Sequence, residues 1–445
     1  MKYLLLLTMS FSLTFFSAEA QNSKEEPLQG YIIYKQGNKT IAIGDVDRAE
    51  KARSTKADVV FNKVVKLLSN SGGGEITIKQ GDFPIHAPIN LENRVTIRGA
   101  GNASILRLMS DNEKGIILSA ESKTQIKLEN FTCAGDESHP NENSTGVFFR
   151  KTGLSEIKSV YSHDFRGYGF WLKDDCFANL LVENMTSGND KAGYFIDKTL
   201  WVNTNPGGGF VPNKLIGCYS YAEDGHAFLF DKAICQDIVG CVYYLPKGHG
   251  FYFRNNSTSN LVSGCRGFMG FQDGIHLENA DEMNISSNII GWNWGNNLEM
   301  HHATWTIVSA NEFIDAGGRQ DPQYSIYMHG DVKACQISNN LIFNWFDNQI
   351  MQGGIFESEE CSENQITDNI INFYKDKGVE SLGENSRTGY NFEIPEGYDG
   401  PNKGNFLPKI DPKLDPSEFP GFSMNLNSAL KNAHEMLEKM NRVKE

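Results

Sequence analysis

The chain has 445 residues, and its 55 acidic residues outnumber its 41 basic residues, which gives a formal net charge of −14 at pH 7. It contains no basic run or stripe that could neutralise a series of phosphates, so we expect no nucleic-acid partner. The charge does not exclude an anionic sugar, because a binding groove can be locally basic.

The first residues have the features of an export signal. Lys2 precedes an apolar stretch that ends near Ala18-Glu19-Ala20, which predicts a signal peptide over residues 1–20, cleaved near Ala20. The apolar stretch is too short and too interrupted to predict a membrane span. We therefore expect the mature protein to be periplasmic or secreted.

A five-residue phrase recurs through the middle of the chain, most often every 23 or 24 residues. It starts at Gly146, Gly169, Gly193, Ala227, Gly250, Gly274, Asn297, Ser325 and Gln349. A fixed period in this range predicts a solenoid of stacked repeats. The second and fourth residues of the phrases are almost all apolar. Because side chains alternate along a strand, these residues should face inward and the third and fifth residues outward.

A second ladder runs in phase with the phrases, and most of its members follow them at a constant distance. It consists of Cys218, Cys241, Cys265, Asn288, Asn311 and Asn340. Stacked Asn side chains can hydrogen-bond to the turns above and below them inside a coil. Each repeat should therefore contain a first strand, a turn, a second strand, a tight Asn turn and a third strand.

This pattern resembles the right-handed parallel β-helix of the pectate lyase-like superfamily, roughly from Gly72 to Phe373. A predicted helix over residues 57–70, followed by Gly-Gly-Gly and the strand-like stretch to Asp82, is similar to the beginning of the first coil in that superfamily. The resemblance implies an all-β solenoid whose open end is covered by this helix, since solenoid ends require caps.

Three segments are expected after the signal peptide. Residues 21–71 form an N-terminal segment with the capping helix, residues 72–375 form the parallel β-helix, and residues 376–445 form a C-terminal extension. The extension contains a second predicted helix, which either caps the other end or joins subunits of a homo-oligomer. Its apolar residues are Leu430, Ala433, Leu437 and Met440.

The eight cysteines are expected to be buried free thiols that act as small apolar residues, with bridges between stacked coils as the alternative. Three of them belong to the inward ladder. Four more fall at another repeating position, just before the second strand: Cys176, Cys235, Cys335 and Cys361.

The outward positions of the phrases form a two-column strip, and its central rows contain residues suited to catalysis. They are Asp231, Tyr252, Arg254, His276, Glu278, Glu299, His301, Tyr327 and His329. A solvated sheet face would also be polar, but several His residues beside Glu and Tyr in consecutive rows favour a catalytic or ligand-binding role. Trp171 in the strip, and Trp292 and Trp294 in a loop before it, are candidates for stacking on sugars, although each could also pack in the core.

The resemblance implies carbohydrate chemistry on a polysaccharide, either β-elimination or hydrolysis. A lyase needs a base for the C5 proton of a uronic acid, a partner for its carboxylate and an acid for the leaving oxygen. His276 or His301 could be the base, Tyr327 the acid and Arg254 the carboxylate partner. We favour a lyase, because His, Tyr and Arg outnumber carboxylates in the strip.

Two alternatives stay open. A glycoside hydrolase or glycosyl-transferring enzyme needs two carboxyl groups, and Glu278 and Glu299 would lie about 8 Å apart at their Cα atoms. A non-catalytic glycan-binding protein would use the strip only for binding.

The chain lacks the calcium-binding Asp set and Arg motif of pectate lyases, and the paired Asp motifs of polygalacturonases. No catalytic residue of those families can therefore be carried over. A bound calcium ion is possible as a cofactor. A transition-metal site is a weaker alternative, with its ligands drawn from Glu299, His301, His302, His329 and Asp331.

Overall fold

The structure is a computed structural model that describes residues 30–199, 211–316, 323–344, 351–374 and 376–395. The predicted signal peptide and the predicted C-terminal helix lie outside these residues and stay predictions. No helix in the described part of the chain is both long enough and apolar enough to cross a membrane.

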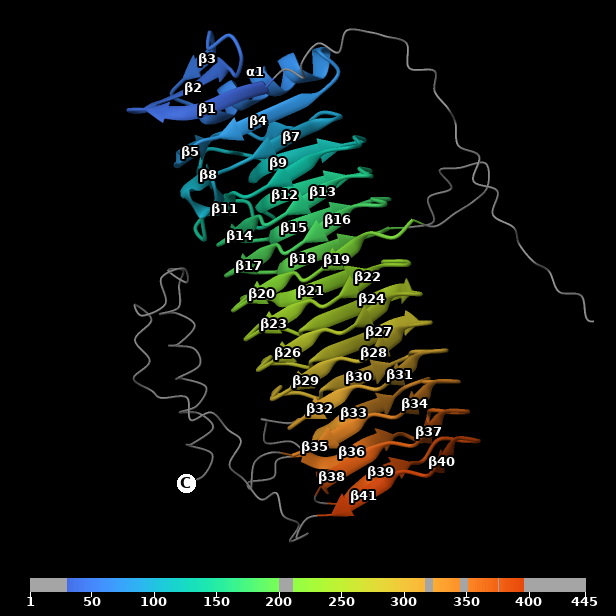
Figure 1. The fold of residues 1–445 in the computed structure, drawn as a ribbon. Coiled ribbons are helices and arrows are strands. Elements are labelled where there is room, and N and C mark those ends of the chain that lie inside the picture. Colours follow the sequence, from blue (N-terminus) through green and yellow to red (C-terminus); the bar gives the residue numbers. More distant parts are fainter. Residues whose placement is uncertain (1–29, 200–210, 317–322, 345–350, 375, 396–445) are drawn as a thin grey trace, which may run out of the picture.

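Three long parallel sheets stack coil upon coil and form the predicted right-handed parallel β-helix (Figure 1). In the described residues, sheet A has 16 strands and ends with β40 (Arg387–Gly389), and sheet B has 13 strands from β5 (Gly81–Ile85) to β41 (Phe392–Pro395). Sheet C has 12 strands from β6 (Ile89–Asn90) to β39 (Lys377–Ser381). The coils thus continue past the predicted boundary at residue 375.

Sheet C contains the recurring phrase, and its neighbouring strands pair in parallel. Between β6 and β39 it consists of β9 (Ile116–Glu121), β12 (Thr145–Arg150), β15 (Tyr168–Lys173), β18 (Ala192–Asp197), β21 (His226–Asp231), β24 (Phe251–Thr258), β27 (Ile275–Asp281), β30 (Leu298–His301), β33 (Gln323–His329) and β36 (Met351–Glu357). The inward columns are confirmed: Phe230, Phe253, Leu277 and Met300 are fully buried. Burying these columns provides the main driving force for stacking the coils.

The predicted register is wrong in the last repeat. The phrase was expected to start at Gln349, with Met351 facing outward. Instead, Ile355 pairs with Ile326 and Phe356 pairs with Tyr327, so the outward residue is Phe356. A longer connection before β36 breaks the period. The apolar residues that occur at the expected spacing, such as Met351, therefore lie at the beginning of β36, ahead of the positions that pair with the phrase of β33.

The Asn ladder is present as predicted. Asn311 Oδ1 accepts hydrogen bonds from the backbone N–H of Asn288 at 3.0 Å and from its side-chain amide at 2.9 Å, and Asn340 does the same for Asn311. The ladder satisfies polar groups that are buried between coils, which would otherwise destabilise the fold. All eight cysteines are free thiols, and all but Cys235 are buried, in agreement with the prediction.

The predicted N-terminal helix is α1 (Ala57–Asn70), which lies at the N-terminal end of the solenoid and packs against its first strands (Figure 1). Val60, Val64 and Leu68 are fully buried in this contact, whereas Val59, although it is also apolar, is 51% exposed. The face of the helix that carries the regularly spaced apolar residues is thus the one that meets the coils.

Candidate functional site

The structure confirms that the predicted strip forms two columns on sheet C. The first column aligns Tyr252, His276, Glu299 and Tyr327 on successive coils, and the second aligns Arg254, Glu278, His301 and His329. Neighbouring coils lie about 4.8 Å apart, so adjacent members of a column are within reach of one another.

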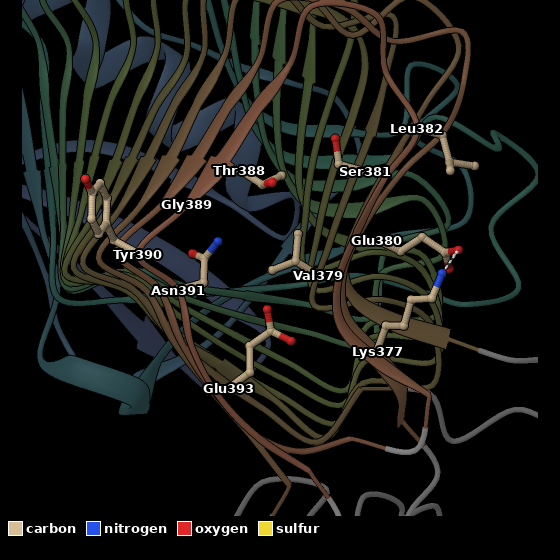
Figure 2. A pocket seen from close by; sticks show the side chains of 10 residues that line it. All are labelled: Lys377, Val379, Glu380, Ser381, Leu382, Thr388, Gly389, Tyr390, Asn391 and Glu393. Atoms are coloured by element: carbon tan, nitrogen blue, oxygen red, sulfur yellow. Dashed lines mark hydrogen bonds and ion pairs between the residues drawn. The ribbon is translucent and has the colours of Figure 1, made fainter.

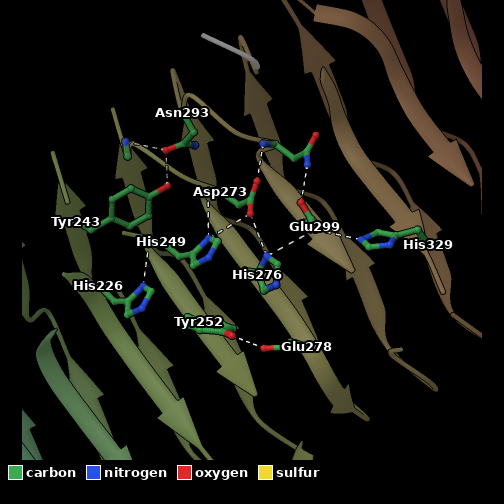
Figure 3. Close-up of polar contacts among 12 residues, drawn as sticks. His226, Tyr243, His249, Tyr252, Asp273, His276, Glu278, Asn293, Glu299 and His329 are labelled. Carbon is green, nitrogen blue, oxygen red and sulfur yellow. Dashed lines mark hydrogen bonds and ion pairs between the residues drawn. The ribbon is translucent and has the colours of Figure 1, made fainter. Parts of the chain in front are cut away.

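The centre of the strip is a pair formed by His276 and Asp273. Nδ1 of His276 lies 2.9 Å from Oδ2 of Asp273 (Figure 3). Asp273 is buried, with only 6% of its surface exposed. Burial opposes ionisation of Asp273, but its hydrogen bond with His276 holds the pKa of the carboxyl below its ordinary range. Burial likewise opposes the charge on His276, and the Asp273 hydrogen bond outweighs it and raises the pKa of the imidazole above 6.5. Asp273 thus fixes the orientation of His276 and strengthens it as a base.

Asp273 belongs to a third column that the sequence analysis missed, which we call the lead-in column. It consists of His226, His249, Asp273 and Asn296, each directly before a phrase. Each side chain accepts the backbone N–H of the next member, at 3.0 Å, 3.2 Å and 2.7 Å in order, and Asn296 accepts that of Tyr324 at 3.2 Å. The spacing of these residues, the same 23 or 24 as in the phrases, was the signal that could have revealed them.

The two histidines of the lead-in column are neutral. Burial lowers the pKa of His226 to about 3, and burial also lowers the pKa of His249. Because each Nδ1 accepts a backbone N–H, the proton of the neutral ring lies on Nε2. Nδ1 of His249 also lies 3.2 Å from Oδ2 of Asp273, but we do not regard this contact as an ion pair, since that nitrogen already acts as an acceptor.

One group of three possible metal ligands occurs in the described residues. One ring nitrogen of His249, a carboxylate oxygen of Asp273 and one ring nitrogen of His276 lie within 4.8 Å of one another. The geometry does not suit an ion, because Nδ1 of His249 is occupied by a backbone N–H. The two imidazole rings are tilted against each other by 35°, with their centroids 4.4 Å apart. The ligand set predicted around His301 forms no such group in this part of the chain.

Tyr252 is the phenol next to His276. Their rings meet edge to face with centroids 5.1 Å apart, and the Tyr252 hydroxyl donates a hydrogen bond to the Glu278 carboxylate (Figure 3). Burial, together with Glu278, raises the pKa of Tyr252 to about 12, so the phenol is protonated at neutral pH. Tyr327, the acid expected from the sequence, lies two coils from His276, whereas Tyr252 lies on the neighbouring coil.

Arg254 is already paired within the strip. Its Nε donates to Oδ2 of Asp231 at 2.8 Å, and its guanidinium carbon lies 5.5 Å from the centre of the Tyr252 ring. The contact with Asp231 uses the Nε–H of the guanidinium and orients its terminal nitrogens. These nitrogens are hydrogen-bond donors of the kind that binds a substrate carboxylate.

Glu299 organises the C-terminal half of the strip. It accepts hydrogen bonds from the side chain of Asn296 at 2.9 Å and from Nε2 of His329 at 3.1 Å, and it lies 3.9 Å from Nδ1 of His276. His301 stacks on His329 with ring centroids 4.5 Å apart. Burial and the neighbouring His329 lower the pKa of His301, so this imidazole is a weaker base than His276.

The predicted stacking residues fall into two groups. Trp171 faces outward beside Phe195, with ring centroids 5.7 Å apart, and forms the edge of an apolar cluster on the outer face of sheet C together with Tyr168 and Leu229. Lys173 lies 4.6 Å from the centre of its ring. This cluster lies in the same strip as His276, on the N-terminal side.

Trp292 and Trp294 lie in the turn between β29 (Ile289–Gly291) and β30. Trp292 packs against Phe268, and Trp294 against Phe271, with ring centroids 5.2 Å and 5.0 Å apart. These contacts join the turns of neighbouring coils. A role in binding substrate stays a prediction.

A cavity of about 380 Å³ lies at the C-terminal end of the solenoid, away from the strip (Figure 2). It is lined by residues of the last described coil, among them Val379, Tyr390 and Asn391, and Lys377 pairs there with Glu380 at 2.6 Å. The residues that line this cavity include no histidine, whereas the strip holds His276 against a buried carboxylate, so the strip is the better candidate for catalysis.

No protein-family model and no curated protein matches the chain. Among solved structures, the A-module of the mannuronan C-5 epimerase AlgE4 from Azotobacter vinelandii is 14% identical, with a TM-score of 0.59, over 76% of this chain and 96% of that chain. DFA-IIIase from Arthrobacter chlorophenolicus A6 without its lid is 11% identical, with a TM-score of 0.56, over 73% and 95%. The tailspike of E. coli bacteriophage HK620 is 9% identical, with a TM-score of 0.51, over 77% and 75%. At these identities the similarity establishes the fold, a right-handed parallel β-helix shared with carbohydrate-active proteins.

Proposed function

We propose that the protein is a carbohydrate-active enzyme that removes the proton next to the carboxylate of a uronate-containing polysaccharide, and that it acts as a polysaccharide lyase. The features of residues 1–20 support a periplasmic or secreted location for this activity. The observation that carries the proposal is the arrangement of Asp273, His276 and Tyr252, in which a buried carboxylate holds the imidazole and the phenol lies beside it.

His276 is the proposed base and Tyr252 the proposed acid. The ring of His276 is held by Asp273 at Nδ1 and turns its other edge toward Tyr252 (Figure 3). His276 takes the C5 proton, the electrons of the C5–H bond form the C4–C5 double bond, and the C4–O bond breaks. The leaving oxygen receives the Tyr252 proton, after the hydroxyl has turned from Glu278. A base and an acid in contact with one sugar suit β-elimination.

Arg254 is the proposed partner of the substrate carboxylate. Abstraction of the C5 proton places negative charge on that carboxylate, and a positioned guanidinium stabilises such charge. Asp231 holds the guanidinium beside Tyr252, on the same face as the proposed acid.

The similar structures are compatible with this chemistry. The A-modules of AlgE4 and AlgE6 are mannuronan C-5 epimerases, and epimerisation at C5 also begins with removal of that proton. The HK620 tailspike was solved with a pentasaccharide. These proteins share only the fold with this chain, so they support the class of ligand and not the reaction.

Hydrolysis is less well supported. It requires one of two carboxyl groups to carry a proton. Glu278 and Glu299 both accept hydrogen bonds, from Tyr252 and from Asn296 respectively, so part of the acceptor capacity of each carboxyl group is already used within the strip.

The test is incubation with a panel of uronate polysaccharides in D₂O. A lyase forms 4,5-unsaturated ends that absorb in the near ultraviolet, with a matching release of fragments. An epimerase incorporates deuterium at C5 without new ends. New reducing ends without unsaturation would indicate hydrolysis and contradict the proposal.

The Asp273–His276 pair predicts a specific pH dependence. Since only the neutral imidazole is a base, kcat/KM should rise with pH through the raised pKa of His276. Asp273→Asn removes the charge that raises this pKa, so the rise should move to lower pH, and the maximal rate should fall at least about tenfold. A pH–rate profile and an NMR titration of His276 measure both effects.

A matched control is Asp111→Asn. Asp111 lies 2.6 Å from Nδ1 of His86 at the N-terminal end, outside the strip, so its loss should leave the profile unchanged. An unshifted profile in Asp273→Asn would show that Asp273 does not act through His276.

A further inference from the structure

The outer face of sheet B is apolar over the C-terminal half of the solenoid. Its strands stack along one side of the molecule (Figure 1), in the order β20 (Tyr219–Tyr221), β23 (Val242–Tyr244), β26 (Arg266–Phe268), β29, β32 (Glu312–Ile314), β35 (Leu341–Phe343), β38 (Ile370–Tyr374) and β41. In each strand up to β38 the second residue is buried and faces inward, so its neighbours face outward. Most outward positions hold apolar or aromatic residues, namely Tyr219, Tyr221, Val242, Tyr244, Phe268, Ile289, Ile314, Leu341, Ile370 and Phe392. We call this surface the sheet B face.

The sheet B face is open to solvent along much of its length. Three of its side chains stay well exposed: Tyr219 at 50%, Ile370 at 44% and Phe392 at 61%. The one helix of the described residues, α1, packs against strands at the N-terminal end of the solenoid and leaves the sheet B face uncovered. The outer face of sheet A is more polar in the same coils, where successive strands present Ser263, Ser286 and Ser309. A contiguous exposed apolar surface is typical of a site that another segment or protein covers.

The C-terminal extension begins at this face. β41 is the last strand of sheet B, and the described chain ends with it at residue 395. The face extends over seven steps between coils from β41 to β20, which corresponds to about 34 Å. Residues 396–426 could span roughly 100 Å when fully extended. The segment that follows them can therefore reach any coil of the sheet B face.

The predicted C-terminal helix has a surface that matches the sheet B face. Its apolar residues Leu430, Ala433, Leu437 and Met440 recur every three or four positions, so they form one stripe along the helix. A helix over residues 428–443 would be about 24 Å long and would cover about five coils. A helix of this length is marginally stable by itself in water, and most of its stability comes from packing its apolar stripe on another surface.

The open C-terminal end of the solenoid is less well suited to this stripe. The cavity at that end is lined mostly by polar side chains (Figure 2). Glu393 occupies the position that pairs with Ile371, which is fully buried one coil earlier. An apolar stripe laid over the end would bury the Glu393 carboxylate against nonpolar groups, which is costly. The sheet B face has apolar residues at most of the positions that the stripe would meet.

We infer that the predicted C-terminal helix docks its apolar stripe on the sheet B face of its own chain. The helix thus covers a side of the solenoid, which differs from both of the roles expected from the sequence, a cap on the end and a contact between subunits. The strip on sheet C stays open, because sheets B and C form different faces of the solenoid.

The experiment places the apolar photoreactive residue p-benzoyl-phenylalanine at position 437 of the full chain, in place of Leu437. After irradiation, mass spectrometry of the peptides should locate cross-links within one chain, to strands between β26 and β38. The same residue in place of Glu435, on the opposite side of the predicted helix, should give no comparable cross-link. Cross-links to the peptides around Val379 and Tyr390, cross-links between chains, or no cross-link from position 437 would each overturn the inference.

A matched pair of isoleucines tests the face itself. Ile370 on sheet B and Ile307 of β31 (Ile307–Ser309) on sheet A are both the first residue of a strand, and they are 44% and 41% exposed. Ile370→Asp should lower the yield of the cross-link from position 437 at least about tenfold, because the docked helix would have to desolvate the new charge. Ile307→Asp should leave the yield unchanged. An equal yield in both variants, or an equal loss, would contradict docking on the sheet B face.

Discussion

His276→Gln is expected to lower kcat by about 10²- to 10⁴-fold, which is the usual contribution of a general base. Glutamine keeps a polar side chain of similar reach but cannot accept the C5 proton near neutral pH. The loss should appear in kcat rather than in KM, because His276 acts on the transferred proton and the proposed partner of the substrate carboxylate is Arg254. Initial rates of double-bond formation measure the effect.

His301→Gln is the matched comparison. Both imidazoles lie in the strip, but the pKa of His301 is lowered by burial and by His329, and in the structure it stacks on His329 rather than pairing with a carboxylate. This variant should keep most of the activity. If His276→Gln were fully active, the proposed base would be wrong, and a loss confined to His301→Gln would transfer the role to that residue.

Glu223→Gln is expected to stabilise the protein above pH 7 by as much as about 3 kcal/mol. Glu223 is completely buried in the turn between β20 (Tyr219–Tyr221) and β21. Its carboxyl accepts hydrogen bonds from the backbone and side chain of Asn189 at 2.8 Å and 2.9 Å, and from Ser220 at 3.0 Å. Burial nevertheless outweighs these bonds and raises the pKa of Glu223 to about 7, from 4.5.

The sign follows from proton linkage. Between pH 4.5 and 7 the folded chain holds the Glu223 proton and the unfolded chain does not, so the free energy of unfolding falls as pH rises through this range. Glutamine is neutral throughout and keeps an oxygen for Asn189. The variant should match the wild type near pH 4 and unfold at a higher temperature at pH 8.

Thermal unfolding at several pH values measures this difference, with Glu142→Gln as the control. The Glu142 side chain is 68% exposed, so its replacement should have little effect at any pH. If the Glu223→Gln variant were equally or less stable than the wild type at pH 8, the buried Glu223 carboxylate would not destabilise the fold.

Most of the fold could be predicted because the solenoid repeats one local pattern. Inward residues such as Phe230 and Leu277 recur with the period of the strand, and Asn288 and Asn311 recur with the period of the turn. The prediction was wrong where the period changes. An insertion before β36 moved the strand along the chain, and Phe356 rather than Met351 took the outward position.

The candidate site could be predicted only in part. The strip was found because alternation within a strand fixes which side chains share a face, and Tyr252, His276 and Glu299 do lie in one column. Asp273 and His249 were missed because they precede the strands, where the chain turns from sheet B into sheet C. Alternation does not hold in such turns, so their direction could not be derived from position alone.

The repeat pattern was enough to predict a parallel β-helix and the face of it that carries the histidines, tyrosines and carboxylates. The contacts among these residues became known from the three-dimensional structure: His276 with Asp273, Tyr252 with His276, and Arg254 with Asp231. This difference arises because the period and alternation of strands are properties of the local backbone. Hydrogen-bond partners, in contrast, depend on the path of each turn and on the distance between coils that are more than twenty residues apart in sequence.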